Sequence, residues 1–355
     1  MTTRYYTGDP RVPLVADLWQ QLPFVDPTLA EDPSKYIAPK NLRDAVNVAL
    51  ILGLPLLLTG EPGVGKSCLA RSLNRELGHQ DHELLHFTVK SDTRDSDLFY
   101  NYDTLARFHA VHSPELSADD AHPSRFIRYQ ALGLAILQAK GRAQLPEGIM
   151  TDAARAAFPE HRRRAVVLID EIDKAPHDMP NDILNEIERM EFRIPELFID
   201  QPIKLDSADD KNHRPIVIIT SNGLRELPEA FLRRCLYFHL EMPKFKEDLD
   251  SNNPNEVSIE AIVASRFGEG HFKRHGDLLN TALSLFRYLR QANLHRKPSL
   301  AEFLDWLRYL SNRTEQTPLT ARSDFEISIK AALLKSRKDQ DQLDTYLNDW
   351  QGRTR

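Results

Sequence analysis

The segment Gly60–Ser67, with the sequence Gly-Glu-Pro-Gly-Val-Gly-Lys-Ser, constrains this chain more than any other feature. It fits the pattern Gly-x-x-x-x-Gly-Lys-Ser/Thr, in which glycines let successive backbone N–H groups turn inward around phosphate oxygens. Lys66 can then reach the β- and γ-phosphates of a nucleotide, and the hydroxyl of Ser67 can bind Mg²⁺. The segment therefore predicts a nucleoside triphosphate site. The residues predicted to contact the nucleotide are Gly60, Glu61, Pro62, Gly63, Val64, Gly65, Lys66, Ser67 and Cys68.

The residues on either side of this loop predict the local structure that phosphate binding requires. Leu56–Leu58 is a short apolar run typical of a buried strand, and Cys68–Leu73 has the pattern of a helix. The phosphates would then lie at a helix N-terminus. Apolar residues at helical spacing over Lys40–Leu52 predict another helix, which ends at Gly53. The alternative is a glycine turn with an incidental lysine, and both flanks argue against it.

Composition sets broad limits on the chain. Its 355 residues exceed what one hydrophobic core usually supports, so two domains are expected. A formal net charge of −6 gives no global electrostatic case for nucleic acid binding. Residues 1–24 lack the apolar region of a signal peptide, and the longest apolar run, Val48–Leu58, is too short to span a membrane. Two cysteines imply no disulfide framework, and together these features predict a cytoplasmic protein.

Four further apolar runs alternate with helical segments after the loop, and they are Leu84–Val89, Ala165–Ile169, Ile216–Thr220 and Leu236–Leu240. Such runs are typical of strands buried on both faces of a parallel sheet, and with the strand before the loop they make five. Beyond Pro243 only helical stretches follow, and they are Ile259–Phe267, Leu278–Ala292, Leu300–Leu310, Ile327–Leu334 and Leu343–Trp350.

The predicted fold class is therefore α/β, with a five-stranded parallel sheet and flanking helices followed by a smaller all-α domain. The predicted divisions are an irregular lead-in over residues 1–35, a nucleotide-binding domain over residues 36–245 and a helical domain over residues 246–355. Ligands are expected at the carboxyl ends of the strands.

Polar side chains follow two of the predicted strands. Asp170 and Glu171 come directly after Val166–Ile169, and Asn222 follows the run that ends at Thr220. Asp170 would bind Mg²⁺ directly or through water, and Glu171 would be the general base for a water that attacks the γ-phosphate. Asn222 could hydrogen-bond that water or the γ-phosphate. The alternative for Asp170 and Glu171 is that a buried strand simply ends in acids exposed to solvent. The alternative for Asn222 is a turn or helix-cap residue.

Further along, Leu227-Pro228-Glu229-Ala230 precedes the arginine pair Arg233-Arg234. With the phosphate loop, the Asp-Glu strand and the strand-end asparagine, this series resembles an AAA+ ATPase over residues 36–312. Within that superfamily, the Leu-Pro-Glu-Ala segment with its arginine pair is similar to the MoxR family, as is Tyr36-Ile37 ahead of the loop. The resemblance implies that ATP and Mg²⁺ are bound, that Tyr36 and Ile37 contact the nucleotide, and that the helical domain is a lid.

The resemblance also implies a ring, commonly a hexamer, with ATP bound between neighbouring subunits. Arg234 matches the arginine finger, with Arg233 as the second candidate, and it would stabilise transition-state charge in the neighbour's site. The alternative is a solvated pair at the end of a helix. In this family an arginine usually follows Ser-Pro early in a lid helix, whereas Arg296-Lys297-Pro298-Ser299 has none after its proline. Either Arg296 or Lys297 substitutes for it, or the lid senses the γ-phosphate more weakly.

Two insertions are expected from the resemblance. Residues 191–210 are compatible with a β-hairpin, and residues 91–108 match the family's second-helix insert. The aromatic residues in Leu98–Tyr102 either face the pore of the ring or pack against the sheet, and packing is the favoured interpretation.

The implied function is ATP hydrolysis in a ring that remodels or activates a partner protein, in a chaperone-like role. The resemblance suggests a partner with a von Willebrand factor A domain. One alternative is a nucleic acid-dependent AAA+ ATPase, a helicase or loader, against which the acidic charge balance argues. Another is a P-loop small-molecule kinase, a class that rarely needs a neighbour's arginine or a helical domain of this size.

Overall fold

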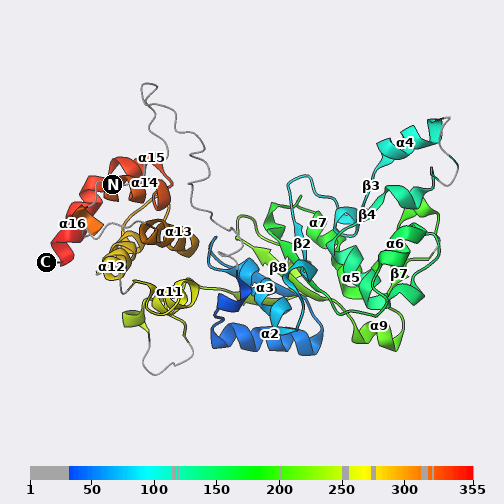
Figure 1. The fold of residues 1–355 in the computed structure, drawn as a ribbon, viewed down its shortest axis with the longest axis horizontal. Coiled ribbons are helices and arrows are strands. Elements are labelled where there is room, and N and C mark those ends of the chain that lie inside the picture. The colour runs from blue at the N-terminus through cyan, green and yellow to red at the C-terminus, as the bar shows by residue number, and fades with distance from the viewer. Residues whose placement is uncertain are drawn as a thin grey trace. The chain divides into compact units, whose positions relative to one another are not determined.

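The computed structural model describes residues 32–113, 117, 120–199, 201–249, 256–272, 277–312, 319–321 and 324–354. Contacts between Cα atoms divide the chain into two compact units, drawn together in Figure 1. Residues 38–61 and 66–241 form one, which we call the sheet unit. The described residues of segments 1–37, 62–65 and 242–355 form the other, the helical unit. The predicted lead-in over residues 1–35 lies outside the described residues as far as residue 31.

A five-stranded sheet forms the centre of the sheet unit, and its strands are β1 (Leu56–Thr59), β2 (Leu85–Thr88), β5 (Val166–Asp170), β8 (Ile216–Ser221) and β9 (Leu236–His239). All pair in parallel, in the order β2-β5-β8-β1-β9, which confirms the predicted fold class. The order places β5, β8 and β1 side by side. The segments that follow these three strands therefore leave the sheet at one edge.

The two edge strands differ from the prediction that all five strands are buried on both faces. Strands β1, β5 and β8 are buried almost throughout, whereas β2 and β9 alternate between half-buried and exposed residues. An edge strand has a neighbour on one side only, and one face of each meets solvent. The sequence carries this alternation, because His86 and Thr88 in β2 and Tyr237 and His239 in β9 occupy every second position.

Short helices flank the sheet, and they are α2 (Lys40–Leu52), α3 (Lys66–Glu76), α5 (Ala131–Lys140), α6 (Asp152–Ala157), α7 (Met179–Asp182), α8 (Leu184–Arg189), α9 (Ala208–Asn212) and α10 (Glu229–Leu232). Helix α2 ends at Gly53, as predicted, because glycine adopts the left-handed φ of 64° found there without strain. Helix α5 packs against β2 and β5, and α3 packs against β5 and β8.

Two small hairpins interrupt this pattern. Strands β3 (Tyr100–Tyr102) and β4 (Ile127–Tyr129) pair antiparallel, with α4 (Thr104–His112) between them in the chain. Strands β6 (Glu191–Phe192) and β7 (Ile203–Lys204) also pair antiparallel, which confirms the hairpin predicted within residues 191–210.

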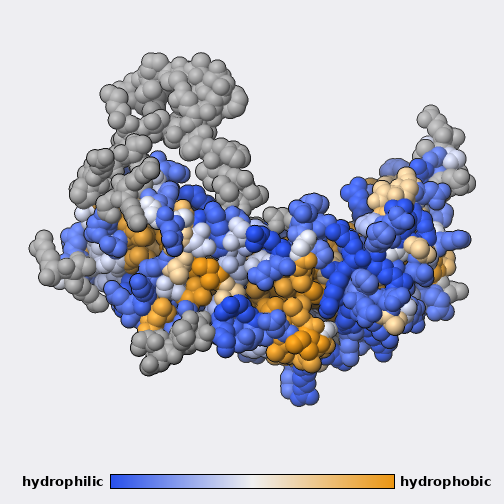
Figure 2. Space-filling model, turned by 60° about the horizontal axis from the view of Figure 1, so that its bottom comes forward, coloured by the Kyte–Doolittle hydropathy of each residue, from blue (hydrophilic) through white to orange (hydrophobic). Residues whose placement is uncertain are grey.

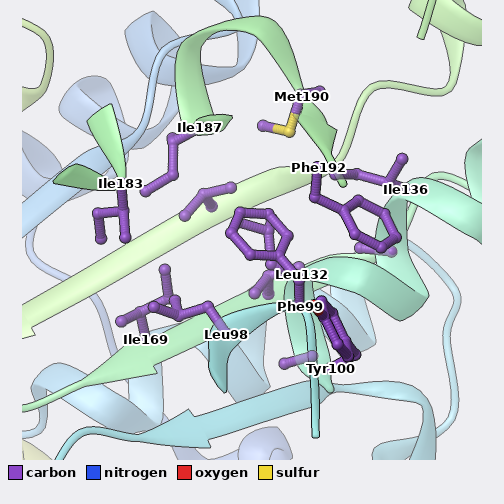
Figure 3. Packing of buried hydrophobic residues seen from close by; sticks show 14 of the residues in the cluster. Leu98, Phe99, Tyr100, Leu132, Ile136, Ile169, Ile183, Ile187, Met190 and Phe192 are labelled. Carbon is purple, nitrogen blue, oxygen red and sulfur yellow. The ribbon is translucent and has the colours of Figure 1, made fainter. Parts of the chain in front are cut away.

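The two hairpins share one apolar cluster, which Figure 3 shows from close by. The ring of Phe99 stacks on that of Phe192 with centroids 5.3 Å apart, and the hydroxyl of Tyr100 donates to Glu196 at 2.9 Å. Phe99 is 3% exposed and Tyr100 is 6% exposed. These two side chains are therefore buried in one apolar cluster with Val167 and Ile169 of β5, in agreement with the interpretation that the aromatic segment packs against the sheet.

The helical unit contains α11 (Ile259–Phe267), α12 (Leu278–Gln291), α13 (Leu300–Ser311), α14 (Phe325–Ala332), α15 (Arg337–Asp341) and α16 (Leu343–Thr354). Each predicted helical stretch corresponds to one of these helices. They enclose an apolar core in which Phe286 stacks on Phe303 with centroids 4.2 Å apart. The indole of Trp306 is buried and donates to the hydroxyl of Ser328 at 3.1 Å, so its polar atom is satisfied.

A helical glycine tests how tightly the first hairpin is packed. A Cβ on Gly133, in α5, would lie 2.0 Å from the carbonyl oxygen of Phe99, so Gly133→Ala should lower the free energy of unfolding by about 1–3 kcal/mol. Gly352→Ala in α16 is the control, because its Cβ meets nothing within 4 Å and should stabilise by at most about 1 kcal/mol. Thermal unfolding followed by circular dichroism measures both. A wild-type midpoint for Gly133→Ala would contradict the packing.

Candidate nucleotide-binding site

The loop between β1 and α3 depends on its three glycines. The backbone angle φ is 148° at Gly60, 77° at Gly63 and 99° at Gly65, and residues that have a Cβ rarely adopt such values. Helix α3 begins at Lys66, directly after the loop, and the N–H groups of a first helical turn have no partner within their own helix. The loop therefore leads into a helix N-terminus suited to bind an anion.

The ammonium group of Lys66 is buried within the loop. It donates to the carbonyl oxygens of Gly60 at 2.8 Å and Glu61 at 2.9 Å, and to Oδ1 of Asn222 at 2.8 Å. These bonds use all three N–H groups of the ammonium. Burial lowers the pKa of Lys66, and the neighbouring carboxylates, with Asp170 foremost, oppose that shift.

The carboxylate of Asp170 lies at the carboxyl end of β5 and has contacts on both oxygens. Oδ1 accepts from the hydroxyl of Ser67 at 2.9 Å and from that of Thr220. Oδ2 lies 3.5 Å from Nε2 of His86. Burial alone would raise the pKa of Asp170, but the contacts with His86, Thr220 and Ser67 outweigh it and hold the pKa below its usual value. An ionised carboxylate therefore lies beside the Ser67 hydroxyl.

Ser67 and Asp170 fit one magnesium ion. Hydroxyl and carboxylate oxygens are ligands that Mg²⁺ prefers. The hydrogen bond of 2.9 Å shows that the Ser67 hydroxyl and the Asp170 carboxylate lie close enough to bind the same ion. Within the described residues, no group of three or more His, Cys, Asp and Glu side chains is arranged to hold a metal. The protein would thus supply these two ligands, and nucleotide phosphates and water would complete the shell.

Glu171 adopts a backbone conformation that is unusual for a residue with a side chain. Its φ of 62° and ψ of 48° are left-handed, and its amide donates to the Thr220 hydroxyl at 2.9 Å. A left-handed residue other than glycine costs about 1–3 kcal/mol, and such residues cluster at functional sites. The two carboxylate oxygens of Glu171 accept from Nζ of Lys174 and, at 3.3 Å, from Nδ2 of Asn222.

Asn222 joins the phosphate loop to the Asp-Glu turn. Its Oδ1 accepts from Lys66 at 2.8 Å while its Nδ2 donates to Glu171 at 3.3 Å. Both contacts are possible because β8, which Asn222 follows, lies between β1 and β5. The structure thus brings together the predicted residues Lys66, Ser67, Asp170, Glu171 and Asn222.

Sequence reasoning missed three side chains of this network. Thr220 and His86 contact Asp170, and Asp173 accepts from the backbone N–H groups of Asn222 and Leu224. Thr220 and Asp173 are polar residues within three positions of predicted site residues, and His86 interrupts an apolar run. A search for polar residues near the ends of the strands would have found Thr220 and Asp173, whereas His86 lies within β2 and was marked only by its place in an apolar run.

The two arginines lie at the opposite edge of the sheet. Arg234 precedes β9 by two residues, whereas the phosphate loop follows β1, and β1 and β9 run parallel. Nε of Arg234 lies 3.1 Å from Glu188, and Arg233 pairs with Glu229. Both side chains are substantially exposed, at 42% for Arg234 and 75% for Arg233. The structure therefore does not bring the arginines to this chain's own loop.

The remaining predicted contacts are more scattered. In the helical unit, Cε2 of Tyr36 lies 3.2 Å from the point where a Cβ on Gly65 would be, so its ring covers the loop backbone. Ile37 is 37% exposed and Val64 is buried. Cys68, in the first turn of α3, is half-buried.

Arg296 and Lys297 lie on the surface of the helical unit, just before α13. The guanidinium of Arg296 is 3.7 Å from the carboxylate of Glu302, and its backbone amide donates to Asp339 at 3.3 Å. A role for either side chain toward a nucleotide stays a prediction.

These features define a P-loop fold, in which a glycine-rich loop joins a central parallel strand to a helix that begins at a phosphate site. Residues 53–225 match the family model described as an AAA domain. The match runs from just before β1 to just beyond Asn222 and so includes the whole network around Lys66 and Asp170. This part of the sheet unit is accordingly similar to an AAA domain, and the chain has the α/β fold of an AAA+ ATPase followed by a helical domain.

No curated protein matches this chain. A crystal structure from Cytophaga hutchinsonii, described as a "putative ATPase", is 13% identical over 90% of this chain and 92% of that chain, with a TM-score of 0.34. A likeness of that size supports no argument about function. Within the described residues, no helix is long and apolar enough to cross a membrane.

Removing the buried ammonium group tests the site directly. Lys66→Ala should weaken the binding of a fluorescent ATP analogue by about 10- to 100-fold, because hydrogen bonds to charged groups are each worth about 1.5–3 kcal/mol. Lys211→Ala, at an exposed position of α9, is the matched control and should bind as the wild type does. Undiminished affinity in Lys66→Ala would show that the loop is not the nucleotide site.

Proposed function

We propose that this protein is a MoxR-type AAA+ ATPase, which hydrolyses ATP in an oligomeric ring and uses that turnover to remodel or activate a partner protein. The observation that carries the proposal is the position of Asn222 between Lys66 and Glu171. Next to them lies the Ser67–Asp170 pair. A cation suited to phosphate, a pair of oxygen ligands suited to a metal and a carboxylate suited to act as a base thus lie at one edge of the sheet.

Binding of ATP requires an exchange of partners at Lys66. Its ammonium group is held by two loop carbonyls and Asn222, and phosphate oxygens would replace the carbonyls. Hydrogen bonds to a charged acceptor are roughly twice as strong as those to a neutral one, so the exchange favours bound nucleotide. A magnesium ion at Ser67 and Asp170 would supply neutralisation of the phosphate charge.

Hydrolysis requires a base beside the γ-phosphate, and Glu171 is the carboxylate that would act there. Its carboxylate is held by Asn222 on one oxygen and by Lys174 on the other. The lysine contact is at the surface and weak, since Lys174 is 44% exposed. A water that enters can therefore displace Lys174 and donate its proton to the freed oxygen, while Asn222 keeps the carboxylate oriented.

The position of Arg234 supports action between subunits. In its own chain Arg234 lies at the edge of the sheet opposite the phosphate loop, so it would act at the nucleotide site of a neighbouring molecule. Figure 2 shows apolar side chains gathered over α2, where Ile51 is 82% exposed and Leu52 is 58% exposed. Leu54, which follows, lines a surface pocket together with Arg234. An exposed apolar surface beside the arginine favours contact with another copy of the chain.

The first test is Glu171→Gln, which keeps the shape of the base but removes its charge. Phosphate release should fall by at least about 100-fold while ATP stays bound, because a general base contributes about 10² to 10⁴ in rate. Glu147→Gln, at an exposed position of the same unit, is the control and should hydrolyse ATP normally. Full turnover in Glu171→Gln would refute the role of Glu171.

The same variant identifies the partner. A ring of Glu171→Gln that holds ATP should retain its client, and the resemblance to the MoxR family leads us to expect a protein with a von Willebrand factor A domain. Mass spectrometry of the co-purified material, compared with that from Lys66→Ala, makes the measurement. ATPase activity that DNA or RNA stimulates, and that salt suppresses, would instead favour a nucleic acid-dependent machine.

The arginine finger makes turnover depend on assembly. Wild-type turnover per subunit should rise with protein concentration, and Arg234→Ala should lose about 10³-fold or more of the rate while binding ATP normally. Arg233→Ala is the matched neighbour and should keep most of the activity. Turnover that is independent of concentration and insensitive to Arg234→Ala would rule out this mechanism.

A further inference from the structure

The carboxylate of Asp173 has no part in the chemistry above, yet it holds the backbone that carries Asn222. Its side chain is 3% exposed. One of its oxygens accepts from the amide of Leu224 at 2.9 Å, and the amide of Asn222 lies 3.2 Å and 3.3 Å from the two oxygens. A buried carboxylate that is hydrogen-bonded in this way fixes its partners tightly, because leaving either side unpaired is costly.

These bonds act where the sheet itself gives no support. The ladder between β1 and β8 ends at the pair Thr59 and Ser221, so Asn222 is the first residue beyond it. Gly223 then turns the chain with a φ of 72°. Asp173 lies two residues after Glu171, and its carboxylate therefore ties the turn after β5 to the turn after β8.

We propose that Asp173 is a positioning residue for ATP hydrolysis. It fixes the backbone of Asn222 so that one side-chain amide can accept from Lys66 and donate to Glu171 at the same time. The inference rests on the proposed function, in which Glu171 is the base. Without Asp173 the phosphate loop still binds ATP, but Glu171 loses the bond that orients it.

This role separates binding from turnover. The phosphate contacts come from the loop and from Lys66, whose other two bonds go to Gly60 and Glu61 and do not involve Asp173. The orientation of Glu171 depends on Asn222, and a misplacement of about 1 Å in a catalytic group can cost roughly 100-fold in rate. Loss of Asp173 should therefore lower kcat and leave nucleotide affinity nearly unchanged.

The test is Asp173→Asn, which keeps the shape but replaces one accepting oxygen by a donor. At saturating ATP, phosphate release should fall by about 10- to 100-fold, while the dissociation constant of a fluorescent ATP analogue changes by less than about threefold. Asp178→Asn is the matched control, since Asp178 is 89% exposed and lies in the same connection after β5. Its turnover should equal that of the wild type.

A double-mutant cycle with Asn222→Ala distinguishes positioning from general support of the fold. If Asp173 acts through Asn222, the double variant Asp173→Asn/Asn222→Ala is no slower than Asn222→Ala alone. Three outcomes would each overturn the proposal. One is that the rate losses of the two single variants multiply in the double variant. The others are a turnover of Asp173→Asn equal to that of the wild type, and a loss of affinity as large as the loss of turnover.

Asp173→Glu covers the case in which the neutral variant does not fold. It keeps the buried charge but moves the oxygens by one methylene, and it should show the same fall in kcat at constant affinity. Full turnover in a folded Asp173→Glu protein would overturn the proposal. A wild-type protein without ATP hydrolysis refutes the proposed function and this role with it, whereas an active wild type with active Asp173 variants refutes the role of Asp173 alone.

Discussion

Parallel pairing of β5, β8 and β1 is the constraint on which the rest of this structure depends. Parallel strands that are adjacent present their carboxyl ends at one edge, so the turns that follow them are neighbours however far apart they lie in the chain. Lys66, Glu171 and Asn222 come from these three turns and are joined through one amide side chain. The same rule sends Arg234, which precedes its strand, to the opposite edge. Its proposed action on a neighbour follows from that polarity.

The site holds several charges in a small buried volume, and each is satisfied. Lys66 has three acceptors, Asp170 accepts from two hydroxyls, and Asp173 accepts from backbone amides. A buried charge without such partners would cost several kcal/mol, so each of these side chains is held firmly by its hydrogen bonds. In the proposed function, nucleotide binding would therefore exchange the loop carbonyls on Lys66 for phosphate oxygens. Asn222 contacts both Lys66 and Glu171, so its position affects the phosphate-binding group and the proposed base together.

The two hairpins show how distant insertions become one body. Phe99 and Phe192 are separated by almost a hundred residues, yet their rings stack at 5.3 Å. The close approach of the Phe99 backbone to Gly133 fixes the first hairpin on α5, and α5 packs on β2 and β5. Because β5 leads into Asp170, this cluster lies on the element that carries the site.

Much of the fold and the site followed from the sequence alone. Short apolar runs and glycine positions gave the five strands, the phosphate loop and the end of α2, because these features report local backbone requirements. Asp170, Glu171 and Asn222 were predicted because polar residues stood directly after apolar runs. The alternation in β2 and β9 was also visible, but which strands lie at an edge depends on strand order, and that is a tertiary property.

Tertiary structure alone decided which polar residues meet. In the sequence, Asp173 and Thr220 are only polar neighbours of predicted residues. The order of the strands places the carboxylate of Asp173 against the backbone of Asn222, and the hydroxyl of Thr220 against the carboxylate of Asp170. His86 gained its contact with Asp170 because β2 pairs with β5. The sequence by itself determined which chemical groups the chain has and which strand each follows. The order of the strands determined which of those groups lie within hydrogen-bonding distance, since hydrogen bonds act over about 3 Å and local pattern carries no distance between separate segments.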